Sequence, residues 1–476
     1  MVQLKNISYS YRITDSEGNE VLRPALKNFD LEIDSGDCIV LTGASGCGKS
    51  TVCRLINGLI PHYFDGELEG DVTISDMNLS SSPIYETAKL VGSVFQNPRS
   101  QFFNVETTSE LAFAAENQQR SPEQIKSDIA AVAKEFDMEL LLDRSMFELS
   151  GGEKQKIACG SVAVANTNII VLDEPTSNLD LEGIETLRCI LAQWKSEGKT
   201  IIIAEHRLYF LRELADRVLV LKDGLIKVDQ EGKDFFELDD NLISHMGLRS
   251  TKLFPTWDDS LKKSFDKIIR FENIYFKYDK THGIDIDNLE IPCEGITAIV
   301  GTNGAGKTTF ARTICGLHKG AKGTAFIDGK RIKISNMLNN CYMVMQDVNH
   351  QLFTDSVLKE VLISVPNTIS ESSKKEKALE ALCLLGLDEL SEYHPMSLSG
   401  GQKQRLAIAS AIAADKKILI FDEPTSGLDY LNMRKTAEVL KMLKEKGKTI
   451  IVITHDTELI ALCADCIVQI NSGKMS

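Results

Sequence analysis

The feature that most constrains this chain is an internal repeat of four motifs. Each copy has a glycine-rich loop, a Leu-Ser-Gly-Gly segment, an apolar run ending in Asp-Glu, and a histidine after a further apolar run. These motifs occupy 43–50, 149–152, 169–174 and 206 in the first copy, and 301–308, 398–401, 418–423 and 455 in the second. A repeat of this length indicates two similar domains, each large enough for its own core.

The spacing of the motifs predicts the domain boundaries. The interval from the Asp-Glu pair to the histidine is the same in both copies, whereas the first copy has additional residues around 61–70, which we interpret as a surface insertion. The segment 246–267 is short and polar and contains Pro255, as is typical of a linker. We therefore predict a first domain over 1–245, a linker over 246–267 and a second domain over 268–476.

Composition limits the class of protein. Of 476 residues, 43% are hydrophobic and 25% charged, which excludes a disordered or fibrous chain. The uncharged run 157–172 is shorter than the ~20 residues that a membrane span requires, so we expect no direct membrane insertion, and the polar N-terminus predicts no secretory signal. A net charge of −15 argues against a nucleic-acid partner, and the 11 cysteines show no disulfide framework.

The apolar runs predict the fold class. They lack polar alternation, which is typical of parallel strands buried on both faces. Helical stretches lie between them, so we predict an α/β fold with ligand sites at the carboxyl ends of the strands. The runs occupy 39–41, 169–172 and 201–203 in the first copy, and 298–300, 418–421 and 450–453 in the second.

The glycine-rich loops have the pattern GxxxxGK[ST] after an apolar strand, which predicts a phosphate site. Glycines let backbone N–H groups surround phosphates, and the helix that follows directs its positive end at them. Lys49 and Lys307 would reach the β- and γ-phosphates of a nucleotide, and Ser50 and Thr308 would bind Mg²⁺. The remaining candidate ATP-binding residues of the two loops are Gly43, Ala44, Ser45, Gly46, Cys47, Gly48 and Thr51, and Gly301, Thr302, Asn303, Gly304, Ala305, Gly306 and Thr309.

The Asp-Glu pairs supply candidate metal and catalytic carboxylates. Asp173 and Asp422 each end an apolar strand, so each would lie near a phosphate loop and face a metal-bound water. Glu174 and Glu423 follow directly and could orient or deprotonate the attacking water. For a single Asp-Glu pair, the ordinary interpretation is a helix cap or a loop acid. Because each of these pairs accompanies a phosphate loop, a catalytic role is favoured.

Two further residue types are weaker candidates for catalysis. Gln96 and Gln346 follow short apolar runs, and their amides could ligate Mg²⁺ and align water, although an isolated glutamine is usually a surface residue. His206 and His455 each end a strand-like run and could hydrogen-bond a γ-phosphate, although each could equally be a packed or capping histidine.

Serine-glycine segments and two tyrosines complete the candidates. A serine N-cap followed by glycines makes either an anion site or merely a helix start. Tyr11 and Tyr278 precede the phosphate loops and could stack on adenine or pack within a strand. The serine-glycine candidates are Ser150, Gly151, Gly152 and Glu153 in the first copy, and Ser399, Gly400, Gly401 and Gln402 in the second.

Together these motifs resemble the ATP-binding-cassette (ABC) ATPases over nearly the whole chain, twice. The resemblance implies P-loop domains that each have a mainly parallel core sheet, an antiparallel β subdomain and a helical signature subdomain. It assigns Asp180 and Asp429 to the D-loops. It implies a pseudo-dimer of the two halves, in which each ATP lies on the phosphate loop of one half and against the signature of the other. One site would pair Lys49 with Ser399, and the other Lys307 with Ser150.

All the catalytic residue types are present in both copies, so we predict two hydrolysis-competent sites. The departures from the family pattern are mild: Lys156 stands where arginine is usual, Asn178 replaces a small D-loop residue, and Cys47 lies in the first phosphate loop. They are compatible with unequal turnover at the two sites.

A finer resemblance follows Gln96 and Gln346. The segment 96–103 matches the QNPxxQ-F pattern of the ATPases of energy-coupling-factor transporters, and 346–353 keeps the second glutamine and the phenylalanine. This resemblance implies a peripheral protein on the cytoplasmic face of the membrane. Its partners would be a transmembrane scaffold subunit and a small membrane subunit that binds a vitamin, a metal ion or a similar micronutrient.

Glu110 and Glu360 are candidate docking residues for that scaffold. Each lies at the same distance after its glutamine, with apolar residues between them. An apolar groove with one carboxylate suits an amphipathic helix bearing an arginine, although a solvated helix acid is the ordinary alternative. Arg99 stands where the family often has an acid, so docking of the first half could differ.

Two other functions remain as alternatives. A conventional importer, such as a sugar importer, also uses ATPases of similar length, but the QNPxxQ pattern and the two intact catalytic sets argue against it. A soluble ABC protein acting on ribosomes usually has a long charged arm or an iron–sulfur cysteine cluster, and this sequence shows neither.

Overall fold

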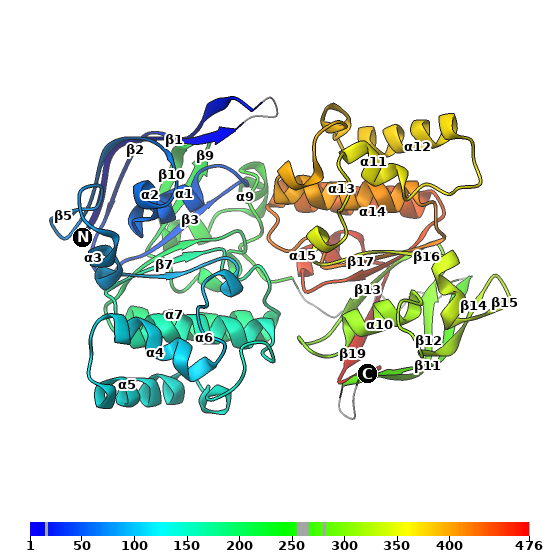
Figure 1. The fold of residues 1–476 in the computed structure, drawn as a ribbon, viewed down its shortest axis with the longest axis horizontal. Helices are drawn as coiled ribbons and strands as arrows, with labels where there is room; N and C mark the ends of the chain where they lie inside the picture. Colours follow the sequence, from blue (N-terminus) through cyan, green and yellow to red (C-terminus); the bar gives the residue numbers. More distant parts are fainter. Residues whose placement is uncertain (15–17, 255–264, 266, 279–281, 476) are drawn as a thin grey trace. The chain divides into compact units, whose positions relative to one another are not determined.

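The computed structural model describes residues 1–14, 18–254, 265, 267–278 and 282–475 (Figure 1). The chain divides into two compact units. The first unit comprises Met1–Leu253 with Asp429–Leu431, and the second comprises Phe254–Leu428 with Asn432–Ser476. Of the linker predicted over 246–267, the residues 255–264 and 266 lie outside the described residues, so the predicted boundaries stay a prediction.

The first unit contains a six-stranded sheet in the order β10-β9-β3-β8-β7-β6. Every neighbouring pair is parallel except β10 and β9. Beside it lies a four-stranded antiparallel sheet in the order β2-β1-β4-β5. The strands are β1 (Val2–Thr14), β2 (Glu20–Ile33), β3 (Cys38–Gly43), β4 (Gly66–Ile74), β5 (Met77–Asn78), β6 (Val91–Val94), β7 (Ile169–Asp173), β8 (Thr200–Ala204), β9 (Arg217–Lys222) and β10 (Leu225–Glu231).

The second unit repeats this topology strand for strand. Its six-stranded sheet has the order β16-β17-β18-β13-β19-β20, and its antiparallel sheet the order β12-β11-β14-β15. The strands are β11 (Ile268–Lys277), β12 (Gly283–Pro292), β13 (Ile296–Val300), β14 (Lys322–Ile327), β15 (Lys330–Lys333), β16 (Cys341–Val344), β17 (Ile418–Asp422), β18 (Thr449–Ile453), β19 (Cys466–Asn471) and β20 (Lys474–Met475). The predicted parallel core sheet and antiparallel subdomain are therefore confirmed in both units.

Helices surround each core sheet. In the first unit they are α1 (Lys49–Ile56), α2 (Leu59–His62), α3 (Ile84–Leu90), α4 (Thr107–Asn117), α5 (Pro122–Glu135), α6 (Gly151–Ala165), α7 (Leu181–Ser196), α8 (Gly232–Phe236) and α9 (Asp240–His245). In the second they are α10 (Lys307–Ile314), α11 (Val357–Leu362), α12 (Glu371–Leu384), α13 (Gly400–Ala413), α14 (Tyr430–Glu445) and α15 (Thr457–Cys463). Helices α4, α5 and α6, and likewise α11, α12 and α13, pack on one another and form the helical subdomains.

The apolar strands are buried on both faces, as their sequence predicts. In β3, Cys38 and Val40 join the apolar cluster under the helices, whereas Ile39 and Leu41 join the cluster shared with the antiparallel sheet. Alternate side chains of a strand point to opposite faces, so a strand covered on both sides does not alternate between apolar and polar residues. This packing fixes the carboxyl end of β3, where the phosphate loop begins.

Candidate ATP-binding and hydrolysis sites

The phosphate loop of the first unit joins β3 to α1. Gly43 has a φ of 142°, and a Cβ there would lie 2.2 Å from the carbonyl oxygen of Leu221. Gly48 has a φ of 114° and directly precedes α1. Only glycine fits both positions, because a side chain would be strained or would clash. Lys49 Nζ, which is buried, donates to the carbonyls of Gly43 at 3.0 Å and Ala44 at 3.2 Å, so the loop folds around its amine.

The second unit builds the same loop between β13 and α10. Gly301 has a φ of 146°, and a Cβ there would meet the carbonyl oxygen of Ile470 at 2.1 Å. Lys307 Nζ donates to the carbonyls of Gly301 at 2.7 Å and Thr302 at 2.9 Å. In both units the loop ends at a helix N-terminus, which suits it for phosphate. The predicted residues 44–47 and 302–305 lie in these two loops, and Thr51 and Thr309 lie in the first turns of α1 and α10.

A hydroxyl and a carboxylate meet beside each loop. Ser50 Oγ donates to Asp173 Oδ1 at 2.9 Å, and Thr308 Oγ1 donates to Asp422 Oδ2 at 2.9 Å. Burial, together with the charge of Glu174, raises the pKa of Asp173 to about 6, and burial raises the pKa of Asp422. Among the described residues, Asp422 Oδ1 is buried and has no hydrogen-bond partner.

A buried carboxylate beside a hydroxyl, with an oxygen that has no hydrogen-bond partner in the case of Asp422, fits a divalent cation. These pairs are therefore suited to Mg²⁺, with Ser50 and Asp173 holding it in the first unit and Thr308 and Asp422 in the second. Mg²⁺ held there together with ATP would neutralise the negative charge that develops on the phosphates.

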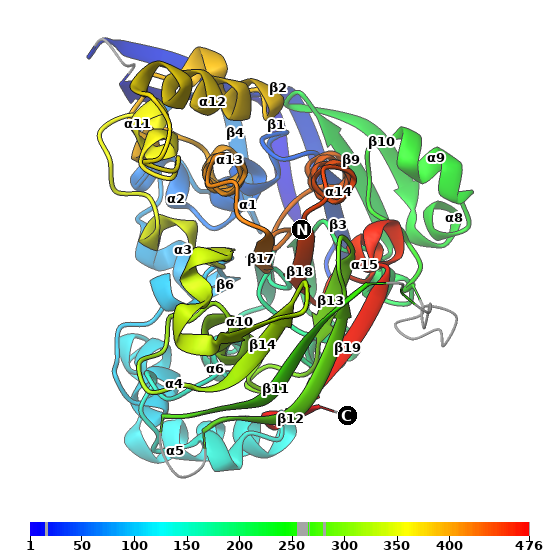
Figure 2. The ribbon, with the colours of Figure 1, turned by 90° about the vertical axis from the view of Figure 1, so that its right-hand side faces the viewer.

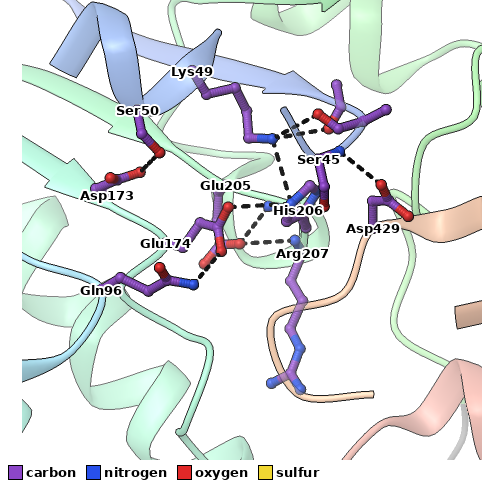
Figure 3. Close-up of polar contacts among 12 residues, drawn as sticks. Ser45, Lys49, Ser50, Gln96, Asp173, Glu174, Glu205, His206, Arg207 and Asp429 are labelled. Atoms are coloured by element: carbon purple, nitrogen blue, oxygen red, sulfur yellow. Dashed lines mark hydrogen bonds and ion pairs between the residues drawn. The ribbon is translucent and has the colours of Figure 1, made fainter. Parts of the chain in front are cut away.

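In the first unit, Glu174 lies at the centre of a polar cluster (Figure 3). Its φ of 45° is unusual for a residue other than glycine, and its N–H donates to the carbonyl of Ala204 at 2.8 Å. Glu174 Oε1 lies 3.2 Å from His206 Nε2, and Gln96 Nε2 donates to Glu174 Oε2 at 2.7 Å. Lys49 Nζ is 3.4 Å from His206 Nε2. The fold thus brings together residues that are far apart in the sequence.

The electrostatics of this cluster keep Glu174 ionised. Burial raises the pKa of Glu174, but the hydrogen bond and charge of His206 and the charge of Lys49 outweigh burial, so the pKa lies below its usual value. An ionised carboxylate beside a phosphate loop can orient or deprotonate a water. Strained backbone at such a position is common at functional sites, where the surrounding structure holds it.

The second unit places its glutamate in the same backbone conformation. Glu423 has a φ of 50°, and its N–H donates to the carbonyl of Ile453 at 2.9 Å. His455 Nε2 lies 3.5 Å from Glu423 Oε1, and Thr454 Oγ1 donates to Glu423 Oε2 at 3.4 Å. Gln346 lies two residues after β16 and is exposed. The histidine and the glutamate therefore meet in both units.

Two buried carboxylates support these clusters and were missed by the sequence analysis. Glu205 accepts from the N–H and hydroxyl of Thr176 and from the N–H groups of His206 and Arg207. In the second unit, Asp456 accepts from Thr425 Oγ1 at 2.7 Å. Each ties the loop after the Asp-Glu pair to the loop that carries the histidine. An acidic residue adjacent to a histidine at the end of a buried strand was the available signal.

The signature segments start helices in both units. Ser150 is the N-cap of α6. Its hydroxyl accepts from the N–H of Glu153, and the side chain of Glu153 accepts from the N–H of Ser150. Ser399 and Gln402 make the same reciprocal pair at α13. This capping box fixes the start of each helix and leaves the remaining N–H groups of the first turn directed outward. Of the D-loop residues, Asp180 caps α7 and Asp429 directly precedes α14.

The two tyrosines lie beside the phosphate-loop helices. Tyr11 is in β1, and its hydroxyl lies 3.1 Å from Thr51 Oγ1 and accepts from Arg54 at 2.9 Å. Tyr278 follows β11, and its hydroxyl lies 2.8 Å from His318 Nε2. Helix α10 packs against β11 and β12 (Figure 2). Each tyrosine is thus tied to the helix that starts at the phosphate loop or to the turn after it.

Glu110 and Glu360 are buried, with only 3% of each exposed. Glu110 Oε2 accepts from the N–H groups of Phe103 at 3.0 Å and Asn104 at 2.8 Å. Glu360 Oε2 accepts from the N–H groups of Phe353 at 3.0 Å and Thr354 at 2.9 Å. The structure therefore places both docking candidates beneath the segment that follows the glutamine, as anchors of its backbone.

Comparison with known proteins agrees with these features. The residues 26–177 and 284–426 each match the family model described as ABC transporter. The chain belongs to this family. Each ABC unit therefore binds ATP with Mg²⁺, and the protein is an ATPase.

Relatives and solved structures extend the match over the whole chain. A Treponema denticola protein named "Putative ABC transporter ATP-binding protein" is 44% identical over 100% of this chain and 96% of its own length. A Clostridium perfringens protein with the same description is 32% identical over 95% of this chain and 87% of its own. The solved structure of an archaeal ribosome recycling factor, aABCE1, in complex with the ribosomal stalk protein aP1, has a TM-score of 0.63 and 20% identity. It covers 98% of this chain and 89% of that chain, a likeness in fold alone.

Among the residues that the structure describes, no helix combines the length and apolar character that crossing a membrane requires.

Proposed function

We propose that this ABC ATPase is the motor of an energy-coupling-factor type importer, which takes up a vitamin, a metal ion or a similar micronutrient. The two units work as a pseudo-dimer, and ATP binding closes it. One ATP lies on the loop of Lys49 and against Ser399, and the other on the loop of Lys307 and against Ser150. ATP can shift the equilibrium between the open and closed pseudo-dimer only if it binds the closed state more tightly. This difference in binding free energy drives the movement of the membrane partners.

The residue roles follow from the local geometry in each unit. Glu174 and Glu423 act on the attacking water, and His206 and His455 contact the γ-phosphate beside them. Gln96 and Gln346 would add an amide oxygen to the Mg²⁺ site. Each also begins the segment that continues to the surface, so binding of the metal would affect the position of that segment. Tyr11 and Tyr278 stack on adenine.

The observation that carries the importer proposal is a pair of presented phenylalanines. Phe103 is 76% exposed and Phe353 77% exposed, and each is held by the buried glutamate beneath it. Exposed aromatic side chains with a fixed backbone are typical of a protein-binding surface, because little conformational freedom is lost on binding. Both presented residues follow the glutamine segments that resemble those of energy-coupling-factor ATPases.

The segment between each glutamine and its phenylalanine is built the same way twice. Gln101 Oε1 accepts from the N–H of Phe95 at 3.2 Å, and Gln351 Oε1 accepts from the N–H of Met345 at 3.2 Å. Each second glutamine therefore bonds back to the residue just before the first. A displacement of Phe103 or Phe353 by a partner would therefore also move Gln96 or Gln346 through this short hydrogen-bonded segment. Such a mechanical link between the partner surface and the ATP site is what a transport motor requires.

The occupant that we propose is an amphipathic helix of a transmembrane scaffold, which in turn holds a small substrate-binding membrane subunit. The ATPase would then lie at the cytoplasmic face of the membrane. Glu110 and Glu360 contribute by fixing the presented loops; that they also receive an arginine of the scaffold is part of the proposal and requires a local opening of each loop.

Affinity purification from detergent-solubilised native membranes tests the proposal. We expect the wild-type chain to retain a multi-spanning scaffold and a small hydrophobic protein, and the variant Phe103→Ser with Phe353→Ser to lose both. Leu242→Ser is the matched control, since it removes an exposed apolar side chain from α9. Two related permease subunits in place of the scaffold would indicate a conventional importer. Ribosomal proteins without a membrane partner would overturn the transport proposal.

A further inference from the structure

His318 lies in the turn after α10 and joins three side chains. Its Nε2 is 2.8 Å from the hydroxyl of Tyr278, and its Nδ1 is 3.0 Å from Oγ1 of Thr313. Its ring stacks on Phe276 at a centroid distance of 4.0 Å and an interplanar angle of 13°. Stacking on Phe276 therefore restricts the tilt of the imidazole, and the contacts at its two nitrogens restrict its rotation within the ring plane.

The direction of these hydrogen bonds follows from Thr313. Its hydroxyl donates to the carbonyl of Thr309 at 2.7 Å, so its oxygen is left to accept from His318 Nδ1–H. A neutral imidazole with the proton on Nδ1 has its lone pair on Nε2. The hydroxyl of Tyr278 must then donate to Nε2. A directed chain of hydrogen bonds thus runs from the first turn of α10 to Tyr278.

The surroundings keep His318 in this neutral form. Burial of the ring, together with the positive charge of Arg312, holds the pKa of His318 below its usual value. At neutral pH the ring therefore has one donor and one acceptor, and each is used.

Tyr278 needs an anchor because it lies at an open edge. It is 57% exposed, and its ring contacts Phe276 and His318 edge-on, at centroid distances of 4.8 Å and 5.3 Å. Neither neighbour is stacked parallel on the Tyr278 ring. Without the bond to His318, the ring would keep only contacts that allow it to tilt.

We propose that His318 is a positioning residue for nucleotide binding by the second unit, which holds Tyr278 at a fixed orientation relative to the phosphate loop. This inference rests on the proposed role of Tyr278 as the platform for adenine. Thr309 is two residues after Lys307, so the hydrogen-bond chain links the helix turn that meets the phosphates to the ring that meets the base. The histidine acts only through Tyr278 and contacts no phosphate.

Nucleotide titration of the full chain tests this role. The chain carries Lys49→Ala, so that binding reports on the second unit, and the probes are ATP and inorganic tripolyphosphate, which lacks a base. His318→Phe keeps a ring on Phe276 but removes both nitrogens. Because one hydrogen bond is lost, we expect the Kd for ATP to rise about 3- to 10-fold and the Kd for tripolyphosphate to stay unchanged.

A second substitution shows whether the effect passes through the tyrosine. In a Tyr278→Phe background, which lacks the hydroxyl, His318→Phe should have no further effect on the Kd for ATP. An unchanged Kd for ATP in His318→Phe, or an equal rise for ATP and tripolyphosphate, would overturn the inference. If His318→Phe lowers the unfolding temperature, Thr313→Val replaces it: it removes the acceptor of Nδ1–H, and a rise confined to ATP is again expected.

Tyr278→Ala separates this inference from the proposed function on which it rests. If Tyr278→Ala leaves the Kd for ATP unchanged, Tyr278 is not the base platform and both proposals for this region fail. If Tyr278→Ala weakens ATP binding but His318→Phe and Thr313→Val do not, the platform stands and only the role of His318 is wrong.

Discussion

The first unit braces its histidine loop with the residue before the histidine, and the second with the residue after it. Glu205 precedes His206 and bonds to Thr176, whereas Asp456 follows His455 and bonds to Thr425. Each acid joins the same two loops in its own unit. Both units thus place a buried carboxylate between these loops, although the residue that supplies it stands at a different sequence position relative to the histidine.

The two tyrosines that we propose as base platforms are also held by different residues. In the first unit, Arg54 donates to Tyr11 and lies over the ring of Phe64, 4.1 Å from its centroid. Phe64 belongs to the additional residues of the first copy, which are therefore more than a surface insertion. In the second unit, His318 takes the anchoring role. In both units the tyrosine hydroxyl has a polar side-chain partner and the ring has aromatic neighbours at a steep angle.

The largest effect should come from the two glutamates that we propose act on the attacking water. Glu174→Gln and Glu423→Gln should each slow ATP turnover at its own site by about 10²–10⁴-fold, because an amide cannot accept a proton from water. Steady-state ATPase assays of both single variants and the double variant measure this, with ATP binding as the control. Unequal residual rates would show that the different bracing matters for catalysis. Near-normal turnover in the double variant would exclude these residues as bases.

The buried acids should affect stability next. Glu205→Gln and Asp456→Asn should each destabilise their own unit by about 1.5–3 kcal/mol, because N–H donors lose a charged acceptor. Scanning calorimetry of the full chain measures the two transitions, and Glu213→Gln, at an exposed position, serves as the control. A cost in one unit but not in the other would break the equivalence of the two braces.

Removal of the tyrosine rings should weaken nucleotide binding in both units. Tyr11→Ala and Tyr278→Ala should each cost about 1–3 kcal/mol of binding energy, equal to about a 5- to 150-fold rise in the Kd for ATP. Each is measured with the opposite phosphate loop disabled by Lys307→Ala or Lys49→Ala. A similar loss in both would show that the two anchors are interchangeable in effect. No loss for Tyr11→Ala would restrict the base platform to the second unit.

The smallest effect concerns the capping boxes, where Glu153 in the first unit corresponds to Gln402 in the second. Burial raises the pKa of Glu153, but the hydrogen bonds from Ser150 and the charge of Arg144 outweigh it, so the pKa lies below the ordinary value of 4.5. A lowered pKa stabilises the folded state above pH 4.5, and this stabilisation is lost as the pH falls through the folded-state value.

Glu153→Gln should therefore lower the stability of the first unit at pH 7 by about 0.3–1 kcal/mol, the range for a charge at a helix N-terminus. The difference from wild type should shrink below pH 4.5. Urea unfolding of both proteins between pH 3 and pH 7 measures it. Gln402→Glu should produce the opposite change in the second unit, and a pH-independent difference would assign the effect to packing.

Much of the fold followed from local patterns. The unalternating run around Ile39 predicted a strand buried on both faces, and β3 is one. The loop motif predicted a strand–loop–helix unit, because the pattern combines the glycines, the lysine and the helix start in eight residues. The placement of Phe64 against Tyr11 could not be predicted, since it depends on how an insertion folds back on a distant strand.

The sequence alone determined that this protein has two ABC units with two complete sets of catalytic residue types, because those motifs are local and their chemistry depends on residue identity. Only the tertiary structure decided which side chains support those sets. Glu205 and Asp456 hydrogen-bond to the loops near the histidines, and the hydroxyl of Tyr278 lies within hydrogen-bonding distance of His318. Glu110 and Glu360 accept hydrogen bonds from the backbone of the segments that carry the exposed phenylalanines. Each of these supports joins segments that are separate in the sequence. A buried carboxylate or imidazole finds its partners through packing, and the identity of those partners is not a local property of the chain.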